Sequence, residues 1–145
     1  MEIREATAAD LSDILNLYKQ PEMDGENILG VNRATEIFEQ FAQHPFYKLF
    51  VVECEEKMVG TYALLIMPNL GHMGALSGIV EDVVVASDQK RKGIGKFMME
   101  HAMQLCRERG CYKLALSSNR NRVNAHTFYE SLGFKKHGYS FLVEF

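Results

Sequence analysis

Apolar residues recur at helical spacing in two stretches near the start of the chain. A short strand is expected around Ile3, and the box Thr7-x-x-Asp10 then starts a helix that ends before Pro21. The next helix lies between the acidic segment 21–30 and Pro45, and its apolar face carries Val31, Ala34, Ile37, Phe38 and Phe41. The pattern therefore predicts two helices ahead of the main sheet.

The spacing then changes to apolar, β-branched runs at 49–54, 59–67 and 78–86. The charged turn Glu55-Glu56-Lys57 separates the first two runs, which predicts a hairpin. The third run, GIVEDVVVA, places Glu81 and Asp82 in the middle of a strand whose other residues are typical of a buried strand. Acids at such a position require a structural or a chemical reason.

Helices and strands alternate in the second half of the chain. The basic, glycine-containing segment 90–95 leads into a helix that ends at Gly110, and a strand is expected at 112–118. Asn124 is expected to cap a further helix, with Gly133 in the left-handed conformation at its end. An aromatic strand at 139–145 closes the chain. This order of elements predicts an α+β or mixed α/β fold.

Length and composition favour a single domain over residues 1–145. The net charge of −3 argues against binding to nucleic acid or to an anionic membrane surface. Three cysteines without C-x-x-C spacing indicate neither a disulfide framework nor a zinc site, and no metal site is expected. Because the chain has neither a secretory signal pattern nor a long apolar run, we expect a cytoplasmic location.

The segment Lys90–Gly95 has the features of a phosphate-binding turn. A strand that runs into a helix start offers free N–H groups, the glycines let a phosphate approach, and three adjacent cations add charge. The segment lacks the G-x-G-x-x-G pattern of dinucleotide-binding folds and the G-K-S/T ending of the P-loop. Taken alone, it leaves a solvated basic turn at an ordinary helix start as the alternative.

Two motifs resemble those of the GNAT N-acetyltransferase superfamily. Val83-Val84-Val85 followed by Lys90-x-x-Gly93-x-Gly95 is similar to the family's Q/R-x-x-G-x-G/A signature, and Asn124-Ala125-His126-x-Phe128-Tyr129-x-x-x-Gly133-Phe134 resembles its second element. The resemblance extends in organisation over essentially the whole chain. Lys90 replaces the usual Gln or Arg, and Arg91 stands where Gly is frequent. Both residues keep a donor or a backbone N–H.

The resemblance implies a twisted, mostly antiparallel sheet with a splayed parallel strand pair and helices on both faces. It also implies acetyl-CoA as cofactor, with the pantetheine arm on the backbone of Val83 and Val85 and the pyrophosphate on the basic segment. Asn124 and Phe128 would border the far side of that arm. The expected cofactor-binding residues are Val83, Val84, Val85, Lys90, Arg91, Lys92, Gly93, Ile94, Gly95, Lys96, Asn119, Asn124 and Phe128.

Acetyl transfer to an amine needs a base, because an alkylamine is protonated at neutral pH. Glu81 is the candidate base, directly or through a water, and its alternative role is a structural ion pair. Neighbouring strand residues face opposite sides, so Glu81 and Asp82 reach one pocket only across a bulge, and Asp82 is expected to be structural. The N–H of Val83 is expected to stabilise the oxyanion. Tyr129 is expected to protonate the leaving thiolate; its alternative role is that of a core aromatic.

The sequence does not decide which amine accepts the acetyl group. Acids at Glu22, Asp24, Glu26, Glu81 and Asp82 favour a small cationic amine. The 119–129 segment resembles the aminoalkylphosphonate and aminoglycoside acetyltransferases, Glu81-Asp82 resembles the glucosamine-6-phosphate acetyltransferases, and Arg120 with Arg122 would suit a phosphate. A non-catalytic acetyl-CoA sensor and a protein or peptide N-acetyltransferase are the competing functions. A homodimer through the aromatic terminal strand is a further expectation.

Overall fold

A five-stranded sheet organises the first of the two units into which the chain divides, Met1–Ala115 and Leu116–Phe145. The computed structural model describes all 145 residues. Strand neighbours are antiparallel except β4 and β5, which are parallel. This mixed sheet confirms the predicted α+β class. In sheet order the strands are β1 (Glu2–Glu5), β2 (Tyr47–Cys54), β3 (Lys57–Met67), β4 (Leu76–Val85) and β5 (Cys111–Ala115).

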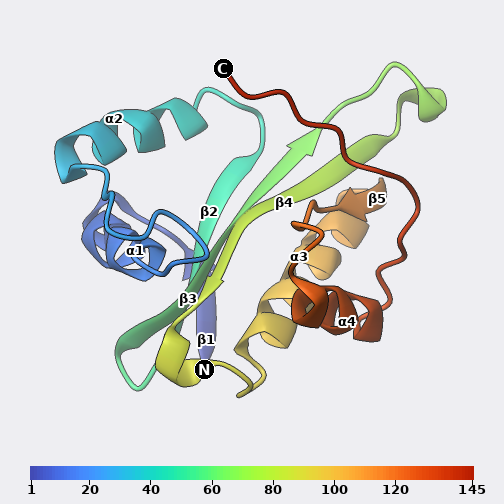
Figure 1. Cartoon of the computed structure of the whole chain (residues 1–145). Coiled ribbons are helices and arrows are strands. Elements are labelled where there is room, and N and C mark those ends of the chain that lie inside the picture. Colours follow the sequence, from blue (N-terminus) through green and yellow to red (C-terminus); the bar gives the residue numbers. More distant parts are fainter. The chain divides into compact units, whose positions relative to one another are not determined.

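Helices cover both faces of the sheet, as predicted (Figure 1). The helices α1 (Leu11–Tyr18) and α2 (Val31–Phe41) lie on one face, where Leu49 and Ala63 of the strands join their apolar residues in one core cluster. The helix α3 (Ile94–Glu108) lies on the other face, and its His101 Nδ1 is 2.6 Å from the hydroxyl of Tyr62 on β3. Because successive strand residues point to opposite faces, both layers draw on the same strands.

The parallel pair separates halfway along β4. Pairing with β5 runs from Leu76 opposite Cys111 to Ile79 opposite Ala115 and stops there, whereas β4 continues to Val85. The stretch 80–85 therefore has no strand partner on its β5 side. This is the splayed strand pair that the sequence resemblance implies, and it leaves backbone groups of β4 available to a ligand.

The second unit contains the helix α4 (Val123–Ser131). Its N-cap is Arg122, so the prediction that Asn124 caps the helix was wrong, and Asn124 lies inside the first turn. Gly133 has the predicted left-handed conformation, with φ of 93°. The N–H of Phe134 bonds to the Tyr129 carbonyl at 3.2 Å, which closes the end of the helix.

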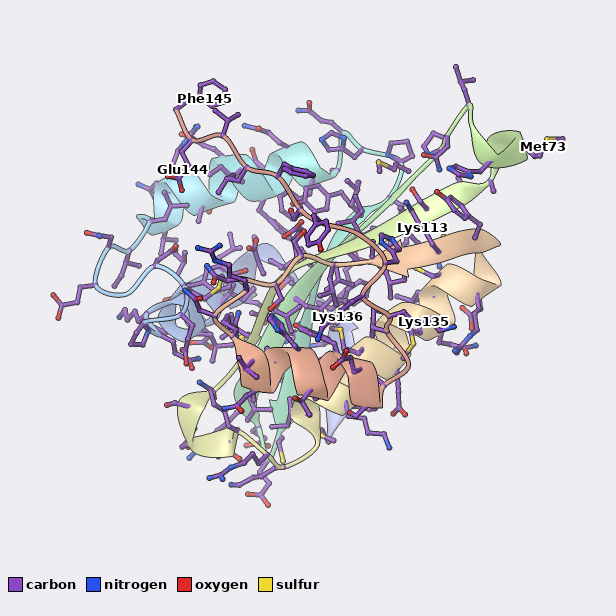
Figure 2. All side chains as sticks on the ribbon, turned by 45° about the vertical axis from the view of Figure 1, so that its right-hand side comes forward. Met73, Lys113, Lys135, Lys136, Glu144 and Phe145 are labelled. Atoms are coloured by element: carbon purple, nitrogen blue, oxygen red, sulfur yellow. The ribbon has the colours of Figure 1, made fainter.

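No strand forms over 139–145, so the predicted aromatic terminal strand was wrong. Alternating aromatic residues fit a pleated surface, but a strand needs a partner for its backbone groups, and none of the pairings involves this segment. Glu144 and Phe145 end the chain with exposed side chains (Figure 2). The homodimer through this segment stays a prediction. No helix of the chain combines the length and the apolar content that crossing a membrane requires.

Candidate active site

A bulge interrupts the pairing of β3 with β4 where the two acids lie. Ala63 pairs with Glu81 and Thr61 pairs with Val84, so one β3 residue faces two residues of β4, Asp82 and Val83. Asp82 has a φ of 52°, in the left-handed region that L-residues seldom adopt. The bulge is the condition under which both acids were predicted to reach one pocket, and strained backbone of this kind is concentrated at functional sites.

Both carboxyl groups act on the α1–α2 side of the sheet. Glu81 pairs with Ala63, which belongs to the core cluster on that face. The charges of Asp82 and Glu81 both raise the pKa of the Tyr47 phenol, after burial, which is the main cause. Burial raises the pKa of Glu81, and the neighbouring Asp82 raises it further. The pKa of Asp82 is raised by burial and then by the charge of Asp24.

Neither acid has a cationic partner in an ion pair. Both residues are exposed, so neither carboxylate needs such a partner for the fold to form. The alternative role of Glu81, a structural ion pair, therefore has no partner in this structure. An unpaired carboxylate with a raised pKa takes up a proton more readily than an ordinary surface carboxylate.

Two tyrosines that the sequence pattern did not connect with the acids lie close to them. Tyr18 ends α1, and the charges of Asp82 and Asp24 add to burial in raising the pKa of its phenol. Tyr47 begins β2, and its ring stacks on Phe41 with the centroids 3.9 Å apart. Tyr18 fits the apolar face of a helix, where an aromatic residue is usually part of the core, and Tyr47 precedes the apolar run 49–54. Only the register of the strands places them beside the acids.

The basic segment after β4 folds into a concave turn of backbone. The short helical turn η3 (Ser87–Gln89) precedes it, and α3 begins directly after Gly93. Arg91 and Gly93 both have left-handed backbone, with φ of 67° and 85°. This explains why glycine is frequent at the position of Arg91. Left-handed residues ahead of a helix N-terminus turn successive N–H groups toward one point, where an anion can accept them.

The residues present fit a diphosphate at this turn, which we call the cradle (residues 90–96). A Cβ built on Gly93 would meet no atom within 4 Å, so the space beside the backbone is open. Three of its cations already have partners, and the pair that Lys90 forms with Glu22 is described below. Lys92 donates to Gln89 at 3.0 Å, and Lys96 lies 3.8 Å from Glu100. The side chains can provide positive charge for the diphosphate, while the backbone N–H groups can donate directional hydrogen bonds to its oxygens.

The cradle adjoins the open edge of β4. Val84 is buried, whereas Val83 and Val85 are half-buried, and all three belong to the stretch that has no partner on the β5 side. The structure therefore brings together the predicted residues Glu81, 83–85 and 90–96 along one strand and the helix that follows it. A cofactor with a pantetheine arm beside residues 83–85 and a diphosphate at residues 90–96 would need the strand edge and the cradle to follow each other in this way.

Two contacts that the sequence did not predict join the α1–α2 connection to this region. The side-chain amide of Gln20 donates to the carbonyl of Val85 at 3.0 Å. The Lys90 ammonium lies 3.0 Å from a carboxylate oxygen of Glu22. Polar residues in a connection give no signal of a partner 65 or more residues away, which is why these links were missed.

The remaining predicted residues belong to the second unit. Asn119 shapes the turn before α4, since its side chain accepts from the Asn121 N–H and its carbonyl contacts His126 Nε2, both at 2.9 Å. The ring of Tyr129 packs near Phe128 and Phe134, with centroids at 5.1 and 5.7 Å. Burial raises the pKa of Tyr129, and Arg122 opposes this in part. The place of Asn119, Asn124, Phe128 and Tyr129 relative to Glu81 stays a prediction.

Comparison with known proteins gives one family. The model of the Acetyltransferase (GNAT) family matches residues 11–134, which includes parts of both units. A glucosamine 6-phosphate N-acetyltransferase from Trypanosoma brucei brucei is 31% identical over 144 residues, covering 94% of this chain and 90% of that protein.

Solved structures agree with this match. A transcriptional regulator from Bacillus halodurans C-125 superposes with a TM-score of 0.91 at 27% identity, covering 99% of both chains. A glucosamine-6-phosphate N-acetyltransferase from Arabidopsis thaliana superposes with a TM-score of 0.77 at 25% identity, covering 99% of this chain and 97% of that one.

Proposed function

Because the chain belongs to the acetyltransferase (GNAT) family, and is thus an N-acetyltransferase, we propose that it moves the acetyl group of acetyl-CoA to a primary amine of a small molecule by direct attack in a ternary complex. The observation that carries this proposal is the bulge that puts Glu81 and Asp82 on one face, on the strand that leads into the cradle. Acetyl-CoA supplies an acetyl group that is activated as a thioester.

The chain's own residues would hold this cofactor in two places. The N–H groups of residues 90–96 and the cations of Lys90, Arg91 and Lys92 would bind the diphosphate. The backbone of 83–85 would bind the pantetheine arm along the edge that β5 leaves open. Asn119, Asn124 and Phe128 of the second unit would border the arm on its other side. The proposal requires the two units to act as one domain, and the family match over 11–134 supports this.

Glu81 would remove the proton from the amine, directly or through a water. Its raised pKa makes it a better base than an ordinary surface glutamate. The Val83 N–H, at the interrupted ladder, would donate to the acetyl oxygen as negative charge develops there. Tyr129 would return a proton to the departing thiolate, since a neutral phenol with a raised pKa keeps its proton at pH 7.

The acceptor would be a cationic amine, because the carboxylates of Asp24, Glu81 and Asp82 lie close enough to the phenols of Tyr18 and Tyr47 to act on them. The relatives' names point to one member of this class, glucosamine 6-phosphate. The three free thiols suit a reducing compartment, so we place the reaction in the cytoplasm.

A thiol-release assay with acetyl-CoA tests the proposal. The panel holds glucosamine 6-phosphate, glucosamine, diamines, aminoglycosides, aminophosphonates and a lysine peptide. The proposal expects release with at least one small amine and none with the peptide. Binding of acetyl-CoA without release for any acceptor would support a cofactor sensor instead, and release only with the peptide would support a protein acetyltransferase.

A further inference from the structure

The segment 19–30 between α1 and α2 is an ordered turn that contacts β4 and the cradle. Its own backbone bonds hold it together, since the N–H groups of Met23 and Gly25 bond to the Gln20 carbonyl at 2.9 and 3.2 Å. The Asp24 N–H bonds to the Tyr18 carbonyl at 3.1 Å. Because these bonds link its residues to one another, a contact that fixes one residue of the turn also helps to position the others.

Two side chains attach the turn to the elements that would bind acetyl-CoA. Gln20 bonds to the Val85 carbonyl on β4, and Glu22 pairs with Lys90 in the cradle. The Glu22 and Lys90 side chains keep 45% and 46% of their surface exposed, so the ion pair is open to solvent and to competing ions. Residues of the same turn face the acceptor side, because the charge of Asp24 reaches both Asp82 and Tyr18.

A diphosphate and the Glu22 carboxylate compete for the same ammonium group. Lys90 is the first cation of the cradle, and a diphosphate bound there would bring several negative charges close to Glu22. Like charges repel at this range, and an exposed ion pair is weak enough to yield to a stronger anion. Occupation of the cradle would thus break the Glu22–Lys90 ion pair and weaken this attachment of the turn.

We propose that the Glu22–Lys90 ion pair is an autoinhibitory contact that closes the diphosphate cradle and ties it to the acceptor-side turn. Coenzyme A opens the contact when its diphosphate takes Lys90, so in the cofactor-bound enzyme the turn loses this attachment and keeps the Gln20–Val85 bond. The proposal rests on the proposed function of the cradle. By reciprocity, a change in Glu22 that weakens the contact must strengthen cofactor binding.

Calorimetry with coenzyme A tests this on the full chain. Glu22→Gln keeps the size of the side chain but removes its charge, and it should lower the Kd about two- to five-fold. Asp88→Asn is the matched control, because it removes the same charge two residues before Lys90 from a side chain whose hydrogen-bond partner is Gln89. In a Lys90→Gln background, Glu22→Gln should change the Kd less than it does in the unmodified chain.

Hydrogen exchange supplies the second measurement. Coenzyme A should speed exchange at residues 20–27 in the unmodified chain, whereas in Glu22→Gln the exchange should be fast already without ligand. A Kd for Glu22→Gln that falls no further than that for Asp88→Asn, or exchange at 20–27 that is unchanged by coenzyme A, would overturn the contact's role while leaving the proposed function intact. No binding to the unmodified chain would overturn both.

Discussion

The side-chain amide of Gln20, just past the end of α1, donates a 3.0 Å hydrogen bond to the carbonyl of Val85, at the last position of β4. The same amide also donates to the Leu17 carbonyl at 3.2 Å. Gln20 therefore joins the helix that borders the acceptor side to the strand that would hold the cofactor. A substitution of Gln20 is therefore expected to affect both the turn after α1 and the end of β4.

Gln20→Glu should raise the KM for the acceptor more than the KM for acetyl-CoA. The new carboxylate has no N–H to donate, so it is repelled by the carbonyl of Val85 and the turn loses this attachment. We expect the acceptor KM to rise about five- to ten-fold, since a lost hydrogen bond with a repulsion is worth about 1 to 1.5 kcal/mol. Steady-state kinetics measures both constants. Gln104→Glu, an exposed change on α3, should leave them within error.

Glu81→Gln should lower the rate at pH 7 about 100- to 1,000-fold, the usual contribution of a general base. Because burial and Asp82 raise the pKa of Glu81, the acid limb of kcat/KM in the unmodified enzyme should lie above the ordinary glutamate value of about 4.3. The rate should rise with pH through that limb as Glu81 loses its proton. The variant should lose the limb but bind acetyl-CoA as before.

The same substitution gives a stability test with the opposite sign. A pKa that is higher in the folded than in the unfolded state means that ionised Glu81 disfavours folding, so stability falls as pH rises through the folded pKa. At pH 7, Glu81→Gln should therefore melt at or above the temperature of the unmodified chain. A rate loss accompanied by a lower Tm would indicate a structural role, and Glu39→Gln on the exposed side of α2 is the control.

Tyr129→Phe should lower kcat about ten- to a hundred-fold with little change in either KM, because it removes a proton donor that acts only as the thiolate leaves. Tyr139→Phe removes a phenol from a side chain that is 92% exposed in the same unit and should change nothing. Equal kinetics for the two variants would return Tyr129 to the role of a packing aromatic.

Gly93→Ala should weaken both the fold and the cofactor site. A Cβ at this position meets no neighbour, so the cost is the left-handed backbone itself, about 1 to 2 kcal/mol. We expect a lower Tm and a coenzyme A Kd that rises at least about three-fold as the cradle relaxes. Gly30→Ala is the matched control, because Gly30 has a φ of −68° and equally open surroundings. A neutral Gly93→Ala would contradict the account of the cradle.

Asp10→Asn should destabilise the first unit by about 2 kcal/mol. Asp10 accepts two bonds from Arg4, at 2.7 and 2.8 Å, and one from the Thr7 N–H at 2.7 Å. Arg4 and these bonds hold the pKa of Asp10 well below its usual range.

The charge of Asp10 therefore stabilises the fold fully above its unfolded pKa of about 3.9, and this contribution is lost as pH falls below that value. Urea unfolding should show a gap between the unmodified chain and Asp10→Asn at pH 7 that narrows at about pH 3. A gap of constant size would contradict the ionic account, and Asp13→Asn on the exposed side of α1 should show none.

The sequence was sufficient for the elements whose spacing or turn chemistry is local. The hairpin at Glu55–Lys57 and the left-handed Gly133 both follow from residues within a few positions of each other. The acids Glu81 and Asp82 in the apolar run 78–86, which forms most of β4, indicated the site from the sequence. The sequence did not predict the bulge at Asp82, which was only the condition under which both acids could reach one pocket. Whether β4 carries an extra residue depends on its register with β3, which no local pattern records.

The remaining features depend on contacts between distant residues. The pairing of Lys90 with Glu22 and of Gln20 with Val85 joins positions 68 and 65 residues apart. The segment 139–145 has the alternation of a strand yet forms none, because alternation specifies a face and not a partner. Asn124 has the right side chain for a cap, but the N-cap is Arg122, so the helix starts at Val123, two residues earlier than a cap at Asn124 would give.

Titration calorimetry of the purified chain with acetyl-CoA tests the central claim most directly. The account predicts one site per chain with a Kd below about 1 mM, within the range that enzymes show for their substrates. Inorganic pyrophosphate should compete for that site, since the cradle alone recognises it. Absence of binding at millimolar acetyl-CoA, or binding that pyrophosphate does not affect, would contradict the account.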